Sequence, residues 1–206
     1  ALFGGKKAIE KEFAPYISLG EKEKKIVLEV LDTGSISGFY GSKGKYFLGG
    51  KYVRKFEEKI CELWGCKFAI TVNSNTSGLD IAMGAIGASP GDEVLTTPWS
   101  MSATAMSILR WGCIPKFIDI EDKTFSINPD LVEKEITSRT KAIMVTNLFG
   151  HPAHLKKLRE IADRNKIYLI EDNAQSPLAK EFGQCSGTIG HIGVLSFNYH
   201  KHIHTG

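Results

Sequence analysis

From residue 68 onward the sequence alternates between short apolar runs and segments with helical periodicity. The apolar runs are short and rich in β-branched residues, so each predicts a buried strand. The expected strands cover residues 68–72, 93–97, 114–119, 141–146, 167–170 and 192–197, and the expected helices cover residues 77–86, 102–111, 128–136 and 153–164. Strands that alternate with helices through short loops form a parallel sheet covered on both faces. The sequence therefore predicts an α/β fold with a mostly parallel sheet flanked by helices.

The first third of the chain has a different organisation. Residues 21–31 and 51–64 have the spacing of amphipathic helices, and the segment between them, residues 34–50, holds six glycines and no acidic residue. One interpretation is a mobile surface loop. The other is a backbone-rich loop near an anionic ligand, with charge supplied by Lys43 and Lys45. We divide the chain into residues 1–66, with the helices and this glycine-rich loop, and residues 67–206, the larger domain.

Composition excludes several classes of protein. The net charge is only +3 and is not clustered, which argues against a nucleic-acid partner. No uncharged apolar run approaches the roughly 20 residues needed to span a bilayer, and the first residues lack the apolar core of a signal peptide. Four cysteines fit neither a zinc pattern nor a disulfide framework. We expect a soluble, cytoplasmic protein without a membrane partner.

Polar residues directly follow the apolar runs, at the end of a parallel sheet where ligands gather. Glu171-Asp172-Asn173-Ala174-Gln175 follows the run 167–170. An aspartate there could hold a protonated ring nitrogen of a cofactor. The other interpretation of this segment is a helix cap or a solvated turn.

Two further segments have the same placement. Lys201 closes Ser196-Phe197-Asn198-Tyr199-His200-Lys201, and a lysine in a pocket can form a Schiff base when burial or nearby charge lowers its pKa. Most lysines are solvated, so this signal alone is weak. Asn73-Ser74-Asn75-Thr76-Ser77-Gly78 precedes an expected helix, whose N-terminus offers hydroxyls and free N–H groups to a phosphate.

Three alternating histidines, His200, His202 and His204, would face the same side of a strand and could bind zinc. No carboxylate lies nearby in sequence to complete the site, and Lys201 sits among them. We therefore expect no metal.

Taken together, these segments resemble one family, the pyridoxal-phosphate (PLP) sugar aminotransferases of the DegT/StrS type, within fold-type I. The resemblance extends over essentially the whole chain. It is carried by Phe3-Gly4-Gly5-Lys6, Gly91-Asp92-Glu93-Val94, Thr140-Lys141-Ala142-Ile143, Glu171-Asp172 with Ala174-Gln175, and Ser196-Phe197 with Lys201. The combination of the aspartate, serine and lysine motifs is specific, whereas no single motif would be.

The resemblance implies roles for particular residues. Lys201 matches the lysine that binds the cofactor covalently and later moves a proton between substrate and cofactor, and Asp172 matches the carboxylate paired with the ring nitrogen. Gln175 matches the residue beside the phenolic oxygen. The catalytic residues would be Lys201 and Asp172, and the cofactor-binding residues would be Ser74, Asn75, Thr76, Ser77, Trp99, Met101, Asp172, Gln175, Ser196 and Lys201.

The sequence departs from the family pattern at three places. Asn75 stands where the family has glycine between serine and threonine, and asparagine tolerates a left-handed backbone better than most residues. Met101 stands at the usually aromatic position that covers the cofactor ring, and either Met101 or Trp99 could take this role. Asn147 replaces a histidine, and its role is open.

The resemblance also implies the reaction and the partners. Glutamate is the expected amino donor, a nucleotide-linked keto sugar is the expected acceptor, and a homodimer with shared active sites is the expected assembly. A related dehydratase is an alternative, although that activity goes with histidine in place of Lys201. A non-catalytic regulatory member is another. The family continues past the lysine into a small C-terminal domain, whereas this sequence stops five residues later, so we expect a fragment without that domain.

Overall fold

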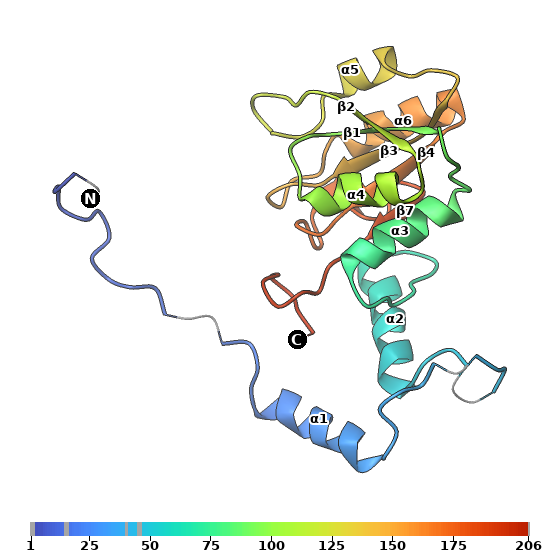
Figure 1. Cartoon of the computed structure of the whole chain (residues 1–206). Helices are drawn as coiled ribbons and strands as arrows, with labels where there is room; N and C mark the ends of the chain where they lie inside the picture. The colour runs from blue at the N-terminus through green and yellow to red at the C-terminus, as the bar shows by residue number, and fades with distance from the viewer. Residues whose placement is uncertain (1–2, 15–16, 40, 45–46, 206) are drawn as a thin grey trace. The chain divides into compact units, whose positions relative to one another are not determined.

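The computed structural model describes residues 3–14, 17–39, 41–44 and 47–205 (Figure 1). The chain divides into two compact units, Ala1–Arg54 and Lys55–Gly206. The domain division after residue 66 stays a prediction. Among the described residues, no helix combines the length and the apolar character required to cross a bilayer.

The first unit contains helix α1, Glu21–Asp32, and the start of α2, Lys51–Trp64, close to the expected ranges. The Glu23 carboxylate accepts a hydrogen bond from the Gly20 N–H at 2.7 Å, which caps α1 at its positive end. Gly38 and Gly50, near the two ends of the glycine-rich segment, lie close together. A Cβ atom on Gly38 would lie 2.4 Å from the backbone nitrogen of Gly50. Lys43 is exposed, and Lys45 lies outside the described residues.

The second unit is built on a parallel sheet, as expected. Its strand order is β2-β1-β3-β4-β7, and every neighbouring pair is parallel. The strands are β1 Glu93–Thr96, β2 Ile114–Phe117, β3 Thr140–Thr146, β4 Tyr168–Asp172 and β7 Ile192–Val194. A separate antiparallel hairpin, β5 Lys180–Glu181 with β6 Gln184–Cys185, was not expected from the sequence, because two-residue strands leave no periodic pattern.

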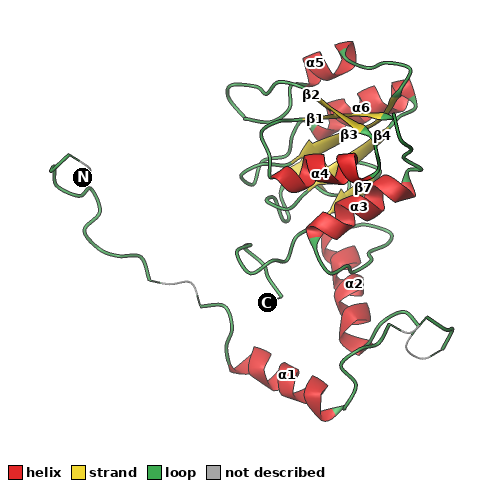
Figure 2. Cartoon of the chain, viewed as in Figure 1, coloured by secondary structure: helices red, strands yellow, loops and turns green. Residues whose placement is uncertain are grey.

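Helices cover both faces of the sheet (Figures 1 and 2). The helices are α3 Asn75–Ala85, α4 Ser102–Arg110, α5 Pro129–Lys134 and α6 Leu155–Asn165. Alternate residues along a strand point to opposite faces, so Met144 and Ile170 pack with residues of α3 and α4, whereas Val145 and Leu169 pack with residues of α5 and α6. Burial on both sides explains why these strands are apolar at nearly every position.

Several predicted helix ends are confirmed. Asn128 caps α5 by accepting a hydrogen bond from the Asp130 N–H at 3.0 Å, with Pro129 in the first turn. Gly65 and Gly112 follow α2 and α4 with φ values of +73° and +68°, in the left-handed region that glycine adopts without strain.

The strand expected at residues 68–72 is wrong: the segment forms no strand. Phe68 and Ile70 are 76% and 83% exposed, and Ala69 packs against the cluster around Trp64. The Thr71 N–H and hydroxyl both donate to the Glu57 carboxylate. β7, at the edge of the described sheet, pairs with β4 alone. An apolar run becomes a strand only when another strand takes up its backbone hydrogen bonds, and no described strand pairs with this run.

The close approach of β7 to the turn at Gly187 predicts a sensitive position. A Cβ atom on Gly193 would lie 1.9 Å from the Gly187 carbonyl oxygen. We expect Gly193→Ala to lower the free energy of unfolding by about 2 kcal/mol or more, because backbone must move. Urea denaturation measures the effect. Gly41→Ala is the matched control, since nothing lies within 4 Å of its Cβ position. Equal stability of the two variants would contradict the described packing.

Candidate active site

The carboxyl ends of β3, β4 and β7 form one row of residues at the edge of the sheet. Thr146 is paired with Asp172, and Asp172 is paired with Val194. The N-termini of α3 and α4 reach the same place, since Asn75 and Thr104 both hydrogen-bond to Asp172. Parallel strands and the helices that follow them thus bring together residues about 100 positions apart, as expected at this edge of an α/β sheet.

Asp172 is the centre of this arrangement and is only 3% exposed. Its Oδ2 accepts a hydrogen bond from the Thr104 hydroxyl at 2.8 Å, and its Oδ1 accepts from the Ala174 N–H at 3.3 Å and the Asn75 amide at 3.4 Å. Burial raises the pKa of Asp172, and these hydrogen bonds together with the positive charge of Lys201 lower it in part. The carboxylate is neither a helix cap nor part of a solvated turn, so that alternative is wrong.

Glu171 is fully buried on the other side of β4. Its carboxylate accepts hydrogen bonds from the backbone N–H groups of Gly187, Ile189 and Gly190, at 2.5, 2.9 and 2.5 Å, and from the Asn147 amide at 3.0 Å. Burial raises the pKa of Glu171, while these donors oppose the rise. Glu171 therefore fixes the turn that precedes β7.

Asn147, whose role the sequence leaves open, belongs to the same network and is fully buried. Its amide nitrogen donates to Glu171 and to the Asn173 side-chain oxygen, both at 3.0 Å, and its oxygen accepts from the Ala153 N–H at 3.0 Å. All the hydrogen-bonding atoms of this amide face protein groups. In this structure Asn147 is a supporting residue of the sheet edge.

The N-terminus of α3 forms the expected hydroxyl-rich turn. Ser74 is the N-cap, and its hydroxyl oxygen accepts a hydrogen bond from the Ser77 N–H at 3.1 Å. Asn75 begins the helix and is not among the residues with positive φ, so the turn does not require a left-handed backbone at this position. Its amide instead donates to the Val194 carbonyl at 3.2 Å and to Asp172. Thr76 and Ser77 are half-buried beside it.

Lys201 and Ser196 lie on the segment after β7. Both are half-buried, and the Lys201 N–H donates to the Asn198 carbonyl in a turn, at 2.8 Å. The positive charge of Lys201 lowers the pKa of Asp172, as the last of several influences after burial and the hydrogen bonds. The Ser196 hydroxyl oxygen accepts a hydrogen bond from the Asn198 N–H at 3.4 Å. Among the described residues, no hydrogen bond joins Ser196 to Thr76 or Ser77, and the phosphate cup stays a prediction.

Trp99 and Gln175 line a shallow cavity of about 300 Å³ together with Ser100 and Phe149. The Gln175 side-chain oxygen accepts a hydrogen bond from the Phe149 N–H at 3.4 Å. Trp99 stacks on Phe125, with ring centroids 5.9 Å apart. Met101 is the N-cap residue of α4, is 70% exposed and does not line the cavity. Which of Trp99 and Met101 covers a cofactor ring stays open.

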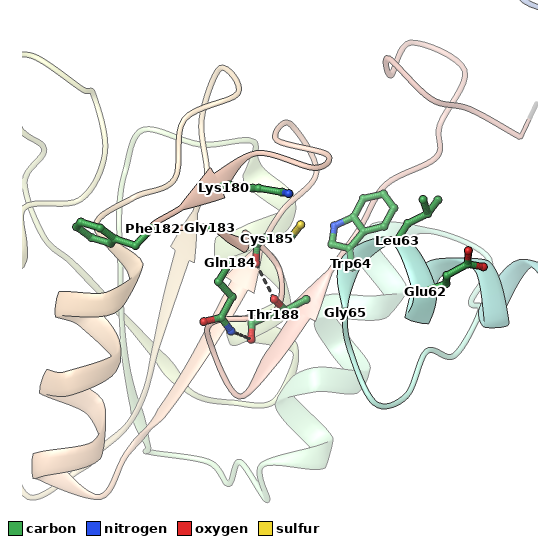
Figure 3. A pocket seen from close by; sticks show the side chains of 10 residues that line it. All are labelled: Glu62, Leu63, Trp64, Gly65, Lys180, Phe182, Gly183, Gln184, Cys185 and Thr188. Carbon is green, nitrogen blue, oxygen red and sulfur yellow. Dashed lines mark hydrogen bonds between the residues drawn. The ribbon is translucent and has the colours of Figure 1, made fainter.

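A larger cavity, of about 560 Å³, is lined by residues around Trp64, Lys180 and Cys185 (Figure 3). None of the predicted site residues lines it. Within the described part of the chain, no group of three or more histidine, cysteine or acidic residues could hold a metal ion. The rings of His200 and His204 lie edge-on to the Tyr199 ring, with centroids 5.8 and 5.5 Å away.

The comparison with known proteins agrees with this geometry. A model of the DegT/DnrJ/EryC1/StrS aminotransferase family matches residues 40–206. The chain belongs to this family.

Relatives within the family are similar over most of this chain. GDP-perosamine synthase from Escherichia coli O157:H7 is 37% identical over 189 residues, which are 92% of this chain and 49% of that protein. The solved aminotransferase from Psychrobacter cryohalolentis superposes with a TM-score of 0.86 at 32% identity, over 95% of this chain and 47% of its own. A GDP-4-keto-6-deoxymannose-3-dehydratase, solved with a trapped PLP-glutamate geminal diamine, superposes with a TM-score of 0.81 at 28% identity. The match covers 91% of this chain and 47% of the dehydratase chain. The chain spans about half the length of the relatives it matches.

Sequence reasoning missed the hydroxyl groups that surround Asp172. Thr104 and Ser100 lie four residues apart, a spacing that brings two side chains together at the start of a helix. That signal was present in the sequence. Thr146 carried no comparable signal, because its neighbours come from the loop before α4 and from β4.

The burial of Asp172 predicts a specific pH dependence in the cofactor-free protein. Its folded pKa is raised above the ordinary value of 3.8, so its contribution to stability is present below that value and is lost as the pH rises through the folded pKa. We therefore expect Asp172→Asn to become more stable relative to wild type, by about 1 kcal/mol, as the pH rises through this window. Urea unfolding at a series of pH values measures the difference.

The amide group introduced by Asp172→Asn also changes the hydrogen bonds at this position, which shifts the free energy of unfolding by an amount that does not depend on pH. The test is therefore how the difference from wild type changes with pH. Thr96→Val is the control, because it changes a buried side chain that does not titrate. A difference between Asp172→Asn and wild type that stays constant across the pH range would contradict the raised pKa.

Proposed function

We propose that the protein is a PLP-dependent sugar aminotransferase that moves an amino group from glutamate to a nucleotide-linked keto sugar. One observation carries the proposal. A buried aspartate lies at the carboxyl end of β4, and a lysine follows β7, the parallel strand paired with β4; the charge of this lysine lowers the pKa of the aspartate. A lysine that can bond covalently to a cofactor and a carboxylate that can pair with its ring nitrogen are the two groups this chemistry requires.

The described residues fit the cofactor. Bound PLP supplies an electron sink for the substrate carbanion. Asp172 would hold a proton on the ring nitrogen, because its carboxylate is desolvated and fixed by donors from α3, α4 and its own turn. The N-terminus of α3, with Ser74, Thr76 and Ser77, and Ser196 after β7 would bind the phosphate. Lys201 would bind the cofactor and then move the substrate proton.

Support for the substrates comes from the relatives. One relative is named GDP-perosamine synthase, and one structural neighbour was solved with a trapped PLP-glutamate geminal diamine. These names favour a nucleotide-linked sugar as the acceptor and glutamate as the donor. We also propose that the intact protein acts in the cytoplasm as a homodimer whose glycine-rich loop, residues 34–50, borders an active site.

A dehydratase of the same family is the second candidate, because one structural neighbour is such an enzyme. Lys201 argues against it, since the dehydratase activity goes with histidine at this position. Amino transfer converts glutamate into 2-oxoglutarate and puts nitrogen on the sugar, whereas dehydration leaves a product without the new amino group. Incubating the full-length protein with glutamate and a panel of nucleotide-linked keto sugars therefore separates the two candidates by product mass.

The role of Lys201 is tested by trapping the cofactor on the full-length protein. Reduction with borohydride makes the lysine–cofactor bond permanent, and peptide mass spectrometry then finds the modified residue. We expect the cofactor on Lys201 and a loss of more than about 100-fold in activity in Lys201→Ala. Lys180→Ala, which changes an exposed lysine of the β5–β6 hairpin, should keep both properties. Retention of a reducible cofactor by Lys201→Ala would falsify the assignment.

A further inference from the structure

A chain of three hydroxyl groups ends on the carboxylate of Asp172. The Thr146 and Ser100 hydroxyl oxygens are 2.9 Å apart, and the Ser100 and Thr104 hydroxyl oxygens are 2.8 Å apart. The Thr104 hydroxyl donates to Asp172 Oδ2 at 2.8 Å. Thr104 and Thr146 are buried and Ser100 is half-buried. The chain links β3, the loop before α4, α4 itself and β4 through side chains alone.

The ionisation of Asp172 sets the direction of every bond in this chain. A carboxylate only accepts hydrogen bonds, and a hydroxyl carries a single proton. Thr104 therefore gives its proton to Asp172 and must accept from Ser100, and Ser100 in turn must accept from Thr146. All three protons point toward the negative charge. Hydrogen bonds aligned in this way polarise one another, so the remote hydroxyls strengthen the bond that Thr104 makes.

We propose that Ser100, Thr104 and Thr146 form a one-directional hydrogen-bond relay that keeps Asp172 ionised and fixes the orientation of its carboxylate. They are positioning residues, because they act on the cofactor only through Asp172; the value of the relay for the reaction rests on the proposed function. The relay holds Oδ2, while Asn75 and Ala174 hold Oδ1. Because hydrogen bonds reach both oxygens, the protein fixes the orientation of the carboxylate, and a lone pair remains for a ring nitrogen.

The surroundings show why such a device is needed. Burial is the largest influence on Asp172 and favours its neutral form, which could not pair with a protonated ring nitrogen. Lys201 is the positive group whose charge opposes this effect. Glu171, the adjacent acid, makes its hydrogen bonds with Asn147 and the 187–190 turn instead. The hydroxyl relay and the donors on Oδ1 supply the remaining stabilisation of the charge.

The test measures the pKa of Asp172 directly, by carbon-13 NMR of the labelled carboxyl group in the cofactor-free full-length protein. We expect Thr104→Val to lower the acidity constant of Asp172 about tenfold, since a hydrogen bond to a charged group is lost. Thr146→Val, which does not touch Asp172, should act in the same direction by about two- to threefold. Thr104→Ser keeps the hydroxyl and should restore the wild-type value. Circular dichroism checks that each variant is folded.

A double-mutant comparison separates a relay from ordinary packing. Ser100→Ala interrupts the chain, so adding Thr146→Val to it should change the pKa of Asp172 no further. Independent packing effects would instead add. Thr96→Val is the matched control, since its buried hydroxyl on β1 has no hydrogen-bond partner among the described residues, and it should leave the pKa unchanged.

Two outcomes overturn the relay: an unchanged pKa in Thr104→Val, or additive effects of Ser100→Ala and Thr146→Val. A second readout is the pH at which the absorption of bound PLP changes, which should shift in Thr104→Val and recover in Thr104→Ser. If the protein does not bind PLP, the proposed function fails, yet the NMR measurement still decides the relay. The two hypotheses therefore fail separately.

Discussion

Two adjacent carboxylates at the end of β4 are buried on opposite sides of the strand, and burial of charge is tolerated only when every acceptor is satisfied. Glu171 is satisfied by three backbone N–H groups of the 187–190 turn and by Asn147. Asp172 is satisfied by side chains from α3 and α4. Protein hydrogen-bond donors replace water around these two carboxylates, and this requirement fixes the turn before β7 and the starts of α3 and α4.

Glu171 and Asp172 have different surroundings because successive side chains along a strand point to opposite faces of the sheet. Glu171 has all its donors inside the protein, and its contacts are structural. Asp172 faces the hydroxyl-rich side, where Lys201 adds a positive charge and the N-terminus of α3 adds partial positive charge. The end of β4 thus carries a supporting carboxylate, Glu171, and next to it the candidate catalytic carboxylate, Asp172.

Much of the architecture follows from local sequence patterns. The five strands of the sheet and the helices on both faces lie close to their expected ranges, and Asn128, Gly65 and Gly112 end or begin helices as predicted, because each depends on neighbours within one turn. The roles of Asp172 and Lys201 stay predictions, although the charge of Lys201 lowers the pKa of Asp172. The strand expected at residues 68–72 is wrong, because a strand forms only when a segment far along the chain takes up its backbone hydrogen bonds.

The sequence by itself determined how the main strands and helices alternate along the chain, the parallel sheet, and the placement of the candidate site at its carboxyl edge. These features depend on hydrophobic periodicity and on which residues follow each strand, and both can be read from short stretches of sequence. Only the tertiary structure decided which side chains meet there. Thr146 and Ser100 are 46 residues apart, and Thr104 and Asp172 are 68 apart. These hydrogen bonds form because the sheet and α4 bring the hydroxyl and carboxylate oxygens within 3 Å of each other. Such a distance between residues far apart in the chain cannot be read from a local sequence pattern.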